Sequence, residues 1–148
     1  LKARWPTARF QFAGPTGNAA GAIAREALGQ AVEDLGHLED VRPALAACHV
    51  FVYPSYGEGM PRAVLEALAT GRPVITTRTP GCRETVDEIV SGRMVPPADA
   101  KELARAMEGF LIRPELLPIA ERAARLKAKR RFDVRDVNAT MTRVLGIT

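Results

Sequence analysis

Two carboxylates, Glu58 and Glu66, lie on either side of the start of a short predicted helix in residues 54–77, PSYGEGMPRAVLEALATGRPVITT. An ionised carboxylate has two oxygens and about four acceptor positions, so it can accept hydrogen bonds from both hydroxyls of a vicinal diol. Sugars present such diols. Such a pair can bind a ligand rich in hydroxyl groups, and its surroundings decide whether it does.

The helix between these carboxylates is predicted over residues 61–70. Pro61 fits the first helical turn, and Gly71 fits the position just past the end. The unpaired backbone N–H groups at residues 59–62 suit an anionic phosphate. Arg62 and Glu66 are four residues apart and share one face of the helix. A phosphate flanked by hydroxyl-binding carboxylates describes a nucleotide sugar.

Strands and helices alternate along the rest of the chain, and this pattern predicts a parallel α/β sheet of the doubly wound, Rossmann-like type. The apolar run HVFVYP predicts a strand that is buried on both faces. The predicted strands are residues 9–14, 32–38, 49–54, 73–77 and 93–95. The predicted helices are residues 22–31, 41–47, 61–70, 83–90, a helix that follows Asp99, and residues 114–129 and 133–145. In the helix after Asp99, the side chains expected to face inward are Leu103, Met107, Phe110 and Leu111.

The composition is that of a globular protein, with 47% apolar and 26% charged residues in 148. No apolar run approaches the roughly 18–20 residues that span a bilayer. Cys48 and Cys82 lie far apart and predict two structural thiols in a reducing cytoplasm. With two histidines in the chain, we expect no metal site. A net charge of +4 suits anionic ligands without identifying one.

The spacing of the two glutamates is not specific by itself, but its context is. Pro-Ser, Glu-Gly-x-Pro, Leu-Glu-Ala-Leu-Ala and Gly-x-Pro-Val-Ile follow one another in residues 54–77. This segment closely resembles the Glu-x7-Glu signature of retaining glycosyltransferases of the GT-B fold, family 4. Residues 77–86, TRTPGCRETV, look most like bacterial members that build lipid-linked oligosaccharides and surface polysaccharides. The resemblance extends from about residue 8 to residue 137.

The resemblance implies a role for each candidate site residue. Glu66 is expected to bind the ribose hydroxyls of the donor nucleotide, and Glu58 the hydroxyls of the transferred sugar. Each has an alternative as an ordinary solvated acid, and Arg62 has one as a surface arginine. The expected nucleotide-sugar-binding residues are Leu38 at the base, Gly59, Met60, Pro61 and Arg62 at the sugar or diphosphate, Glu66, and Gly81 in the loop that follows the strand of residues 73–77.

One element of the resembled family is missing from the sequence. Its members open this domain with a strand and a Gly-Arg-…-Lys-Gly loop that clamps the donor diphosphate. We therefore expect residues 1–148 to be a C-terminal donor-binding domain without its first strand and without the acceptor domain. In the strand order 3-2-1-4-5-6 the missing strand is central. Its place is expected to be filled by rearranged pairing or by a second molecule, or else to leave the chain less stable.

The implied activity of the parent protein is transfer of a hexose or N-acetylhexosamine, with retention, from a UDP-sugar to a lipid-linked or polysaccharide acceptor. No cofactor is expected, and the domain by itself is expected to be inactive. The alternative function is a non-catalytic module that docks on a membrane or a partner through the basic run of residues 122–135. Nucleic acid is not an expected partner, because no aromatic residues interleave with these charges. A dinucleotide-binding domain is excluded because no G-x-G-x-x-G follows a strand. The expected location is cytoplasmic, with peripheral contact to the membrane.

Overall fold

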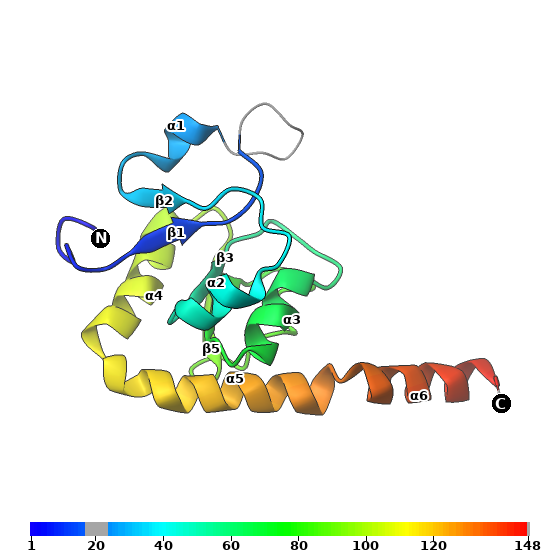
Figure 1. The fold of residues 1–148 in the computed structure, drawn as a ribbon. Coiled ribbons are helices and arrows are strands. Elements are labelled where there is room, and N and C mark those ends of the chain that lie inside the picture. Colours follow the sequence, from blue (N-terminus) through cyan, green and yellow to red (C-terminus); the bar gives the residue numbers. More distant parts are fainter. Residues whose placement is uncertain (17–23, 148) are drawn as a thin grey trace. The chain divides into compact units, whose positions relative to one another are not determined.

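The computed structural model describes residues 1–16 and 24–147. It forms two compact units, Leu1–Val41 and Arg42–Thr148, each with its own parallel sheet (Figure 1). The predicted α/β fold class is confirmed, because every pairing between the described strands is parallel. Each unit is described by itself below.

In the first unit, β1 (Phe10–Phe12) pairs with β2 (Val32–Asp34), with Phe10 opposite Val32. Helix α1 (Arg25–Leu28) is shorter than predicted, because Gly29 adopts a positive φ and ends it. The first two predicted helical residues lie outside the described residues. Strand β2 also ends early, since the Asp34 carboxylate accepts a hydrogen bond from the Gly36 N–H at 2.9 Å and forms a turn.

In the second unit, three strands follow the order β3 (Phe51–Tyr53), β4 (Val74–Thr77), β5 (Gly92–Val95). The central strand β4 is buried along its whole length, as its run of apolar and β-branched residues requires. Strand β3 is only half-buried, so the prediction that it is buried on both faces is wrong. Within the described residues β3 has a paired neighbour on one side only, which leaves its side chains less covered.

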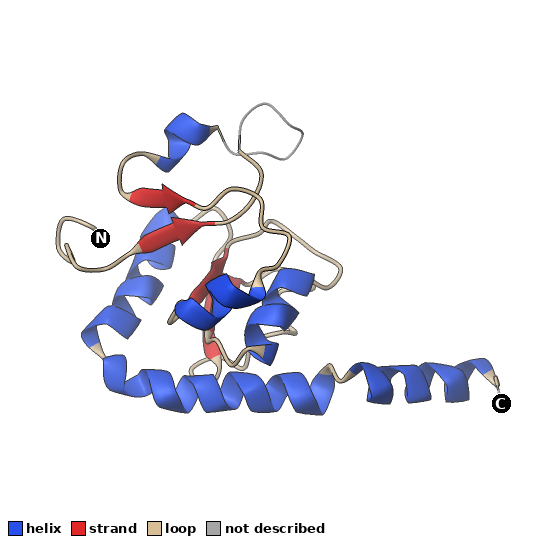
Figure 2. Ribbon diagram, in the orientation of Figure 1, coloured by secondary structure: helices blue, strands red, loops and turns tan. Residues whose placement is uncertain are grey.

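Helices surround this sheet (Figure 2), and the core is formed by side chains of both strands and helices. Helix α3 (Arg62–Ala69) buries Val64, Ala67 and Leu68, and its neighbour α5 (Leu117–Arg131) buries only alanines. These small side chains let the two helices approach closely. On α4 (Ala100–Ile112), Phe110 packs with Ile75 of β4, as the sequence predicts. Leu103 and Met107 pack against the same cluster, which confirms three of the four residues of the predicted inward face; Leu111 is half-buried and is not part of this cluster.

The helix ends follow the capping residues in the sequence. Asp99 caps α4 by accepting hydrogen bonds from the N–H groups of Lys101 and Glu102. Gly71 lies just past α3 with φ +77°, as predicted. The remaining helices are α2 (Arg42–Ala47), the 3₁₀ turn η1 (Pro114–Leu116) and α6 (Val134–Leu145).

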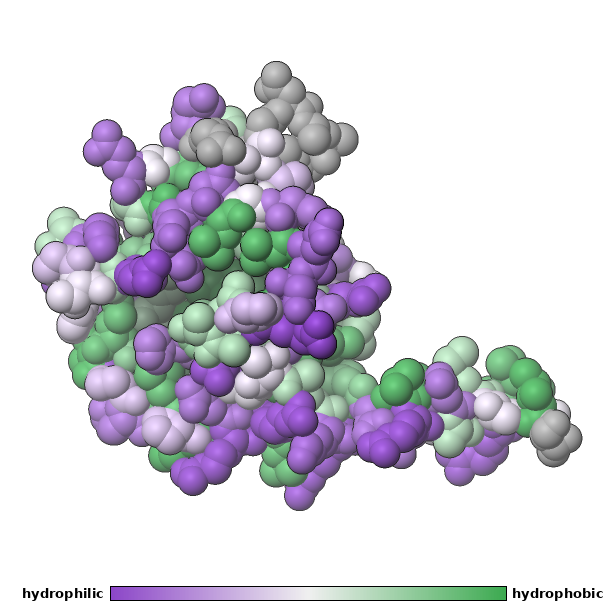
Figure 3. All heavy atoms as spheres, in the orientation of Figure 1, coloured by the Kyte–Doolittle hydropathy of each residue, from purple (hydrophilic) through white to green (hydrophobic). Residues whose placement is uncertain are grey.

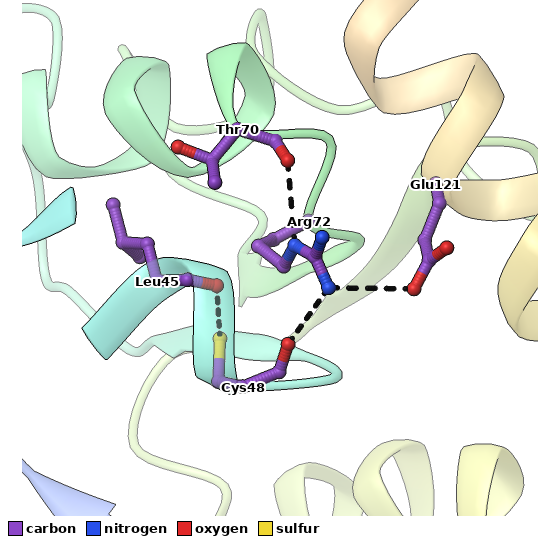
Figure 4. A network of polar contacts seen from close by, with 5 residues as sticks. All are labelled: Leu45, Cys48, Thr70, Arg72 and Glu121. Carbon is purple, nitrogen blue, oxygen red and sulfur yellow. Dashed lines mark hydrogen bonds and ion pairs between the residues drawn. The ribbon is translucent and has the colours of Figure 1, made fainter. Parts of the chain in front are cut away.

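Arg72 forms polar contacts with residues of α5 and with residues at the ends of α2 and α3 (Figure 4). Its guanidinium donates to the carbonyl oxygen of Cys48 at 2.9 Å and to that of Thr70 at 3.4 Å. The same group pairs with Glu121 of α5 at 3.5 Å. Because Cys48 follows α2 and Thr70 ends α3, one half-buried arginine holds the C-terminal ends of both helices against α5.

The predicted helix at residues 83–90 is wrong. This segment forms turns and an isolated bridge between Glu88 and Gly92. Thr85 is fully buried and its hydroxyl donates to the Cys82 carbonyl, while Ile89 adopts φ +73°. Side-chain to backbone bonds of this kind compete with helical ones, so the local chemistry favours a turn.

Within each sheet, neighbouring strands are those that the predicted strand order places side by side. Strands β1 and β2 are neighbours, and β3, β4 and β5 follow in sequence order. The expectation that a central strand of this arrangement lies outside residues 1–148, and how its place is filled, stays a prediction. Among the described helices, none has the length and apolar character needed to cross a bilayer.

Candidate functional site

Two loops of the second unit start from the carboxyl ends of neighbouring parallel strands. Residues 54–61 follow β3, and residues 78–82 follow β4. Because β3 and β4 are parallel, both loops leave the same edge of the sheet. Ligands of open α/β sheets bind at this edge. The predicted residues Glu58, Gly59 and Gly81 therefore share the edge at which a ligand is expected.

The two loops touch at Glu58 and Gly81. The Glu58 N–H donates to the Pro80 carbonyl at 3.2 Å. A methyl group added at Gly81 would lie 2.1 Å from the Glu58 carbonyl oxygen and 2.6 Å from that of Gly59. Gly81 also has φ +79°, a conformation that side chains rarely adopt. Only glycine fits at this position, which explains the residue type independently of any ligand.

The Glu58 carboxylate is held by two hydroxyl groups. Tyr53 at the end of β3 donates to Oε1 at 2.9 Å, and Ser55 donates to the same oxygen at 3.1 Å. Burial, together with the hydrogen bond to Glu58 and the charge of Glu58, raises the pKa of Tyr53 to about 12. Tyr53 is therefore protonated and serves as a donor at neutral pH.

Helix α3 begins next to this carboxylate. Pro61 is the N-cap of α3, whereas the sequence predicted it inside the first helical turn. The Pro61 carbonyl accepts hydrogen bonds from the N–H groups of Val64 and Leu65. The N–H groups of Arg62 and Ala63 donate to no other described residue. Two backbone donors at the positive end of the helix dipole thus remain for an anion or for water.

Arg62 and Glu66 lie on one face of α3, as predicted, with 3.6 Å between guanidinium and carboxylate. Their side chains are 90% and 42% exposed. An ion pair this open to water contributes little to stability, so either group can turn to a ligand at small cost. Met60 and Gly59 are also exposed.

Leu38 belongs to the first unit, Leu1–Val41, so its predicted contact with the base stays a prediction. Tyr53, Ser55 and Thr77 hold the loop of residues 54–61 and were not predicted from the sequence. Thr77 of β4 accepts from the Ser55 N–H at 3.1 Å and donates to the Ser55 carbonyl. The one available signal was the hydroxyl-bearing residue type at each strand end, which is too common to be specific.

Cys48 is half-buried and Cys82 is buried, and both are free thiols. Burial raises the pKa of the Cys48 thiol, which suits a structural role. Among the described residues, no group of three or more His, Cys, Asp and Glu side chains is placed to hold a metal ion. The expectation that the protein needs neither metal nor cofactor stays a prediction.

A sequence profile of the family described as "Glycosyl transferases group 1" matches residues 1–112. The chain belongs to this family. The family resemblance of residues 54–77 is thereby confirmed, and the matched region contains both glutamates, the start of α3 and Gly81.

Relatives of this group 1 glycosyltransferase chain include two bacterial enzymes. A putative colanic acid biosynthesis glycosyltransferase, WcaL of Escherichia coli, is 35% identical over 114 residues, which are 72% of this chain and 28% of the relative. An N,N'-diacetylbacillosaminyl-diphospho-undecaprenol α-1,3-N-acetylgalactosaminyltransferase of Campylobacter jejuni is 36% identical over 95 residues, 64% of this chain and 25% of the relative. The chain thus spans about a quarter of the length of these relatives.

A solved structure confirms the fold of the group 1 chain. The crystal structure of Anabaena Alr3699/HepE in complex with UDP-glucose matches with a TM-score of 0.75 and 27% identity. The match covers 84% of this chain and 34% of that chain. The fold is therefore that of GT-B glycosyltransferases, as the sequence predicted.

Proposed function

We propose that this chain binds a nucleotide-sugar donor, a UDP-sugar, as the donor-binding domain of a retaining glycosyltransferase. The observation that carries the proposal is the junction of the Glu58 and Gly81 loops beside the start of α3. It brings a held carboxylate and free backbone N–H groups to the ligand-binding edge of a parallel sheet. The family match and the UDP-glucose complex of a structural relative support the same conclusion.

Glu66 accepts hydrogen bonds from the ribose hydroxyls of the donor. Its side chain is 42% exposed and, among the described residues, its carboxylate pairs only with the solvent-exposed Arg62. Both carboxylate oxygens can therefore receive a vicinal diol without breaking a buried contact. Arg62, released from that pair, faces the diphosphate together with the N–H groups at the start of α3.

Glu58 contacts the transferred sugar and is the proposed catalytic residue of this domain. It is half-buried and its carboxylate is oriented by the end of β3. Retention at the anomeric carbon requires stabilisation of the departing nucleoside diphosphate and of an oxocarbenium-like sugar, which depends on positioned charges. Gly59, Met60, Pro61 and Gly81 form the surrounding wall.

The proposed parent enzyme transfers a hexose or N-acetylhexosamine to a lipid-linked or polysaccharide acceptor. The names of the two relatives support this class, since one acts on a diphospho-undecaprenol and the other belongs to colanic acid biosynthesis. The acceptor site and the Arg/Lys clamp of the diphosphate lie in other parts of the parent, so residues 1–148 bind donor weakly and do not turn it over.

Titration calorimetry with UDP tests the proposal. The unmodified chain should bind, and Glu66→Ala should weaken binding roughly tenfold or more, as expected for loss of charge-assisted hydrogen bonds. Glu102→Ala is the matched control, because Glu102 is also a helix glutamate, is 40% exposed and pairs with an arginine. Equal affinities for the Glu66 variant and the unmodified chain, or no binding by either, would contradict the proposal.

A second function is favoured by the C-terminal helices. Helix α6 exposes Val134, Val137, Met141, Val144 and Leu145, whose spacing places them on one face. The last turn of α5 adds Lys129, Arg130 and Arg131, and Figure 3 shows hydrophilic surface along α5 followed by hydrophobic patches along α6. Docking on an anionic membrane through these residues is the alternative to donor binding.

Liposome flotation separates the two functions. Charge reversal at Lys129, Arg130 and Arg131 should abolish flotation with anionic vesicles if the alternative holds. Lys127 is unsuitable for this test, because its side chain is 9% exposed and pairs with Asp87. Absence of flotation by the unmodified chain would exclude membrane docking and leave donor binding as the function.

A further inference from the structure

We propose that Tyr53 and Ser55 are positioning residues that fix which oxygen of Glu58 faces the donor sugar. The inference rests on the proposed function, because it assigns a task to residues that hold the proposed catalytic carboxylate. Neither residue belongs to the predicted site. Tyr53 ends β3, and Ser55 lies two residues further along the loop.

The hydrogen bonds to Glu58 are asymmetric. Tyr53 Oη and Ser55 Oγ both donate to Oε1, at 2.9 and 3.1 Å, whereas Oε2 accepts no hydrogen bond from the described residues. Two charge-assisted bonds on one oxygen fix the rotation of the carboxylate. The second oxygen keeps its lone pairs for a hydroxyl of the ligand. Oε2 is therefore the oxygen presented to the sugar.

The donors are themselves held by the buried strand β4. Thr76 donates to the Tyr53 carbonyl at 2.8 Å, and Thr77 bonds the backbone of Ser55 in both directions. Both threonines are buried. The Tyr53 ring also stacks on Phe51, with 6.1 Å between ring centroids. The position of the Glu58 carboxylate thus depends on the central strand of the sheet and not on the loop alone.

The ionisation state of Tyr53 agrees with this role. The phenol is protonated at neutral pH, as an ordinary tyrosine is, and the rise of its pKa to about 12 extends that state to higher pH. The Tyr53 hydroxyl is therefore available to donate its one proton to Glu58 Oε1. The Ser55 hydroxyl has one proton, and its bond to Glu58 is shorter than its alternative contact with the Gly57 carbonyl at 3.4 Å.

Glu58 is assigned to the sugar and Glu66 to the nucleotide, so the two contacts can be measured separately. If the two hydroxyls act through Glu58, their removal should weaken the contact with the sugar and leave the contacts of Glu66 with the nucleotide unchanged. The measured quantity is the ratio of the dissociation constant for UDP-glucose to that for UDP. Titrations followed by NMR of the 148-residue chain give both constants even when binding is weak.

The variants are Tyr53→Phe and Ser55→Ala, each of which removes one hydroxyl and little else. Each should raise the ratio roughly five- to tenfold, the value of one ordinary hydrogen bond of about 1 kcal/mol, because the loss acts on the sugar through Glu58, and leave the dissociation constant for UDP within about twofold. Ser55→Thr keeps the hydroxyl and should restore the original ratio. Tyr56→Phe is the matched control, since Tyr56 lies in the same loop, is 84% exposed and should change neither constant.

Each outcome decides the inference. An unchanged ratio in Tyr53→Phe and Ser55→Ala, with UDP still bound, overturns the positioning role and leaves the proposed function intact. Equal weakening of UDP and UDP-glucose also overturns it, because that result indicates a general structural effect. If the unmodified chain binds neither ligand, the proposed function fails and the inference fails with it.

Discussion

Replacement of Gly81 by alanine is predicted to disrupt the junction on which the site depends. The added methyl group would lie 2.1 Å from the Glu58 carbonyl oxygen, more than an ångström short of the 3.4 Å at which ordinary contacts begin. The nearby atoms belong to backbone and not to flexible side chains. The two loops must therefore separate, and the hydrogen bond from the Glu58 N–H to the Pro80 carbonyl is lost.

Three terms set the magnitude of this effect. Alanine at φ +79° costs about 1–2 kcal/mol relative to glycine. The displaced packing costs about 1–3 kcal/mol, and the lost hydrogen bond about 1 kcal/mol. The expected loss is about 3–5 kcal/mol, because these terms overlap as the loops relax. For a chain of this length, that loss lowers the melting temperature by roughly 8–15 °C.

Thermal unfolding followed by circular dichroism measures the effect. Gly57→Ala is the matched control, because Gly57 lies in the loop that Gly81 contacts, has no atom within 4 Å of its added methyl group and no positive φ. The control should unfold within about 2 °C of the unmodified chain. If Gly81→Ala unfolds with the control, the contact between the two loops is not the one described here.

Three further predictions concern pH and packing. Burial, together with the hydrogen bond to Glu58, raises the pKa of Tyr53 to about 12, above its unfolded value near 10. The stabilising effect of the protonated phenol is therefore present below pH 10 and lost as the pH rises to 12, so the stability difference between the unmodified chain and Tyr53→Phe should shrink over that interval. A constant difference would show that the pKa of Tyr53 is not raised by its surroundings in the folded chain. Leu68 has no exposed surface, so Leu68→Ala should lower the free energy of unfolding, measured by urea denaturation, by about 2–5 kcal/mol. A loss below about 1 kcal/mol would mean that α3 is poorly packed. The hydrogen bonds from Arg135 lower the pKa of Asp133, the N-cap of α6, to about 2, so the stabilising effect of the Asp133 carboxylate is lost as the pH falls from about 4 to 2. An NMR titration should find the pKa of Asp133 raised in Arg135→Ala. An unchanged pKa would refute the pairing of Asp133 with Arg135.

The elements that sequence reasoning predicted well are those with a strong local signal. Helix α4 follows from Asp99 as a cap and from apolar residues at helical spacing. Helix α3 follows from Pro61 and Gly71, and each end lies one residue inside the predicted range, because Pro61 is the N-cap and Thr70 the C-cap. These features depend on interactions within one or two turns, so the local sequence determines them.

The predictions that failed depend on contacts between distant residues. The turns at residues 83–90 arise because Thr85 and Val86 are buried in the core, which outweighs helical periodicity. The half-exposure of β3 depends on which strands pair with it, and periodicity does not report pairing. The hydroxyls that hold Glu58 come from β3 and the loop after it, and their common residue types gave no specific signal.

The central claim is that the edge of the sheet at Glu58, Gly81 and the start of α3 binds a nucleotide-sugar donor. Amide chemical shifts of the ¹⁵N-labelled chain during titration with UDP test it most directly, because they locate even weak binding residue by residue. The account predicts saturable shifts concentrated at residues 59–66 and at Gly81, and their loss in Glu66→Ala. Shifts confined to α5 and α6, or no shifts at millimolar UDP, would contradict it.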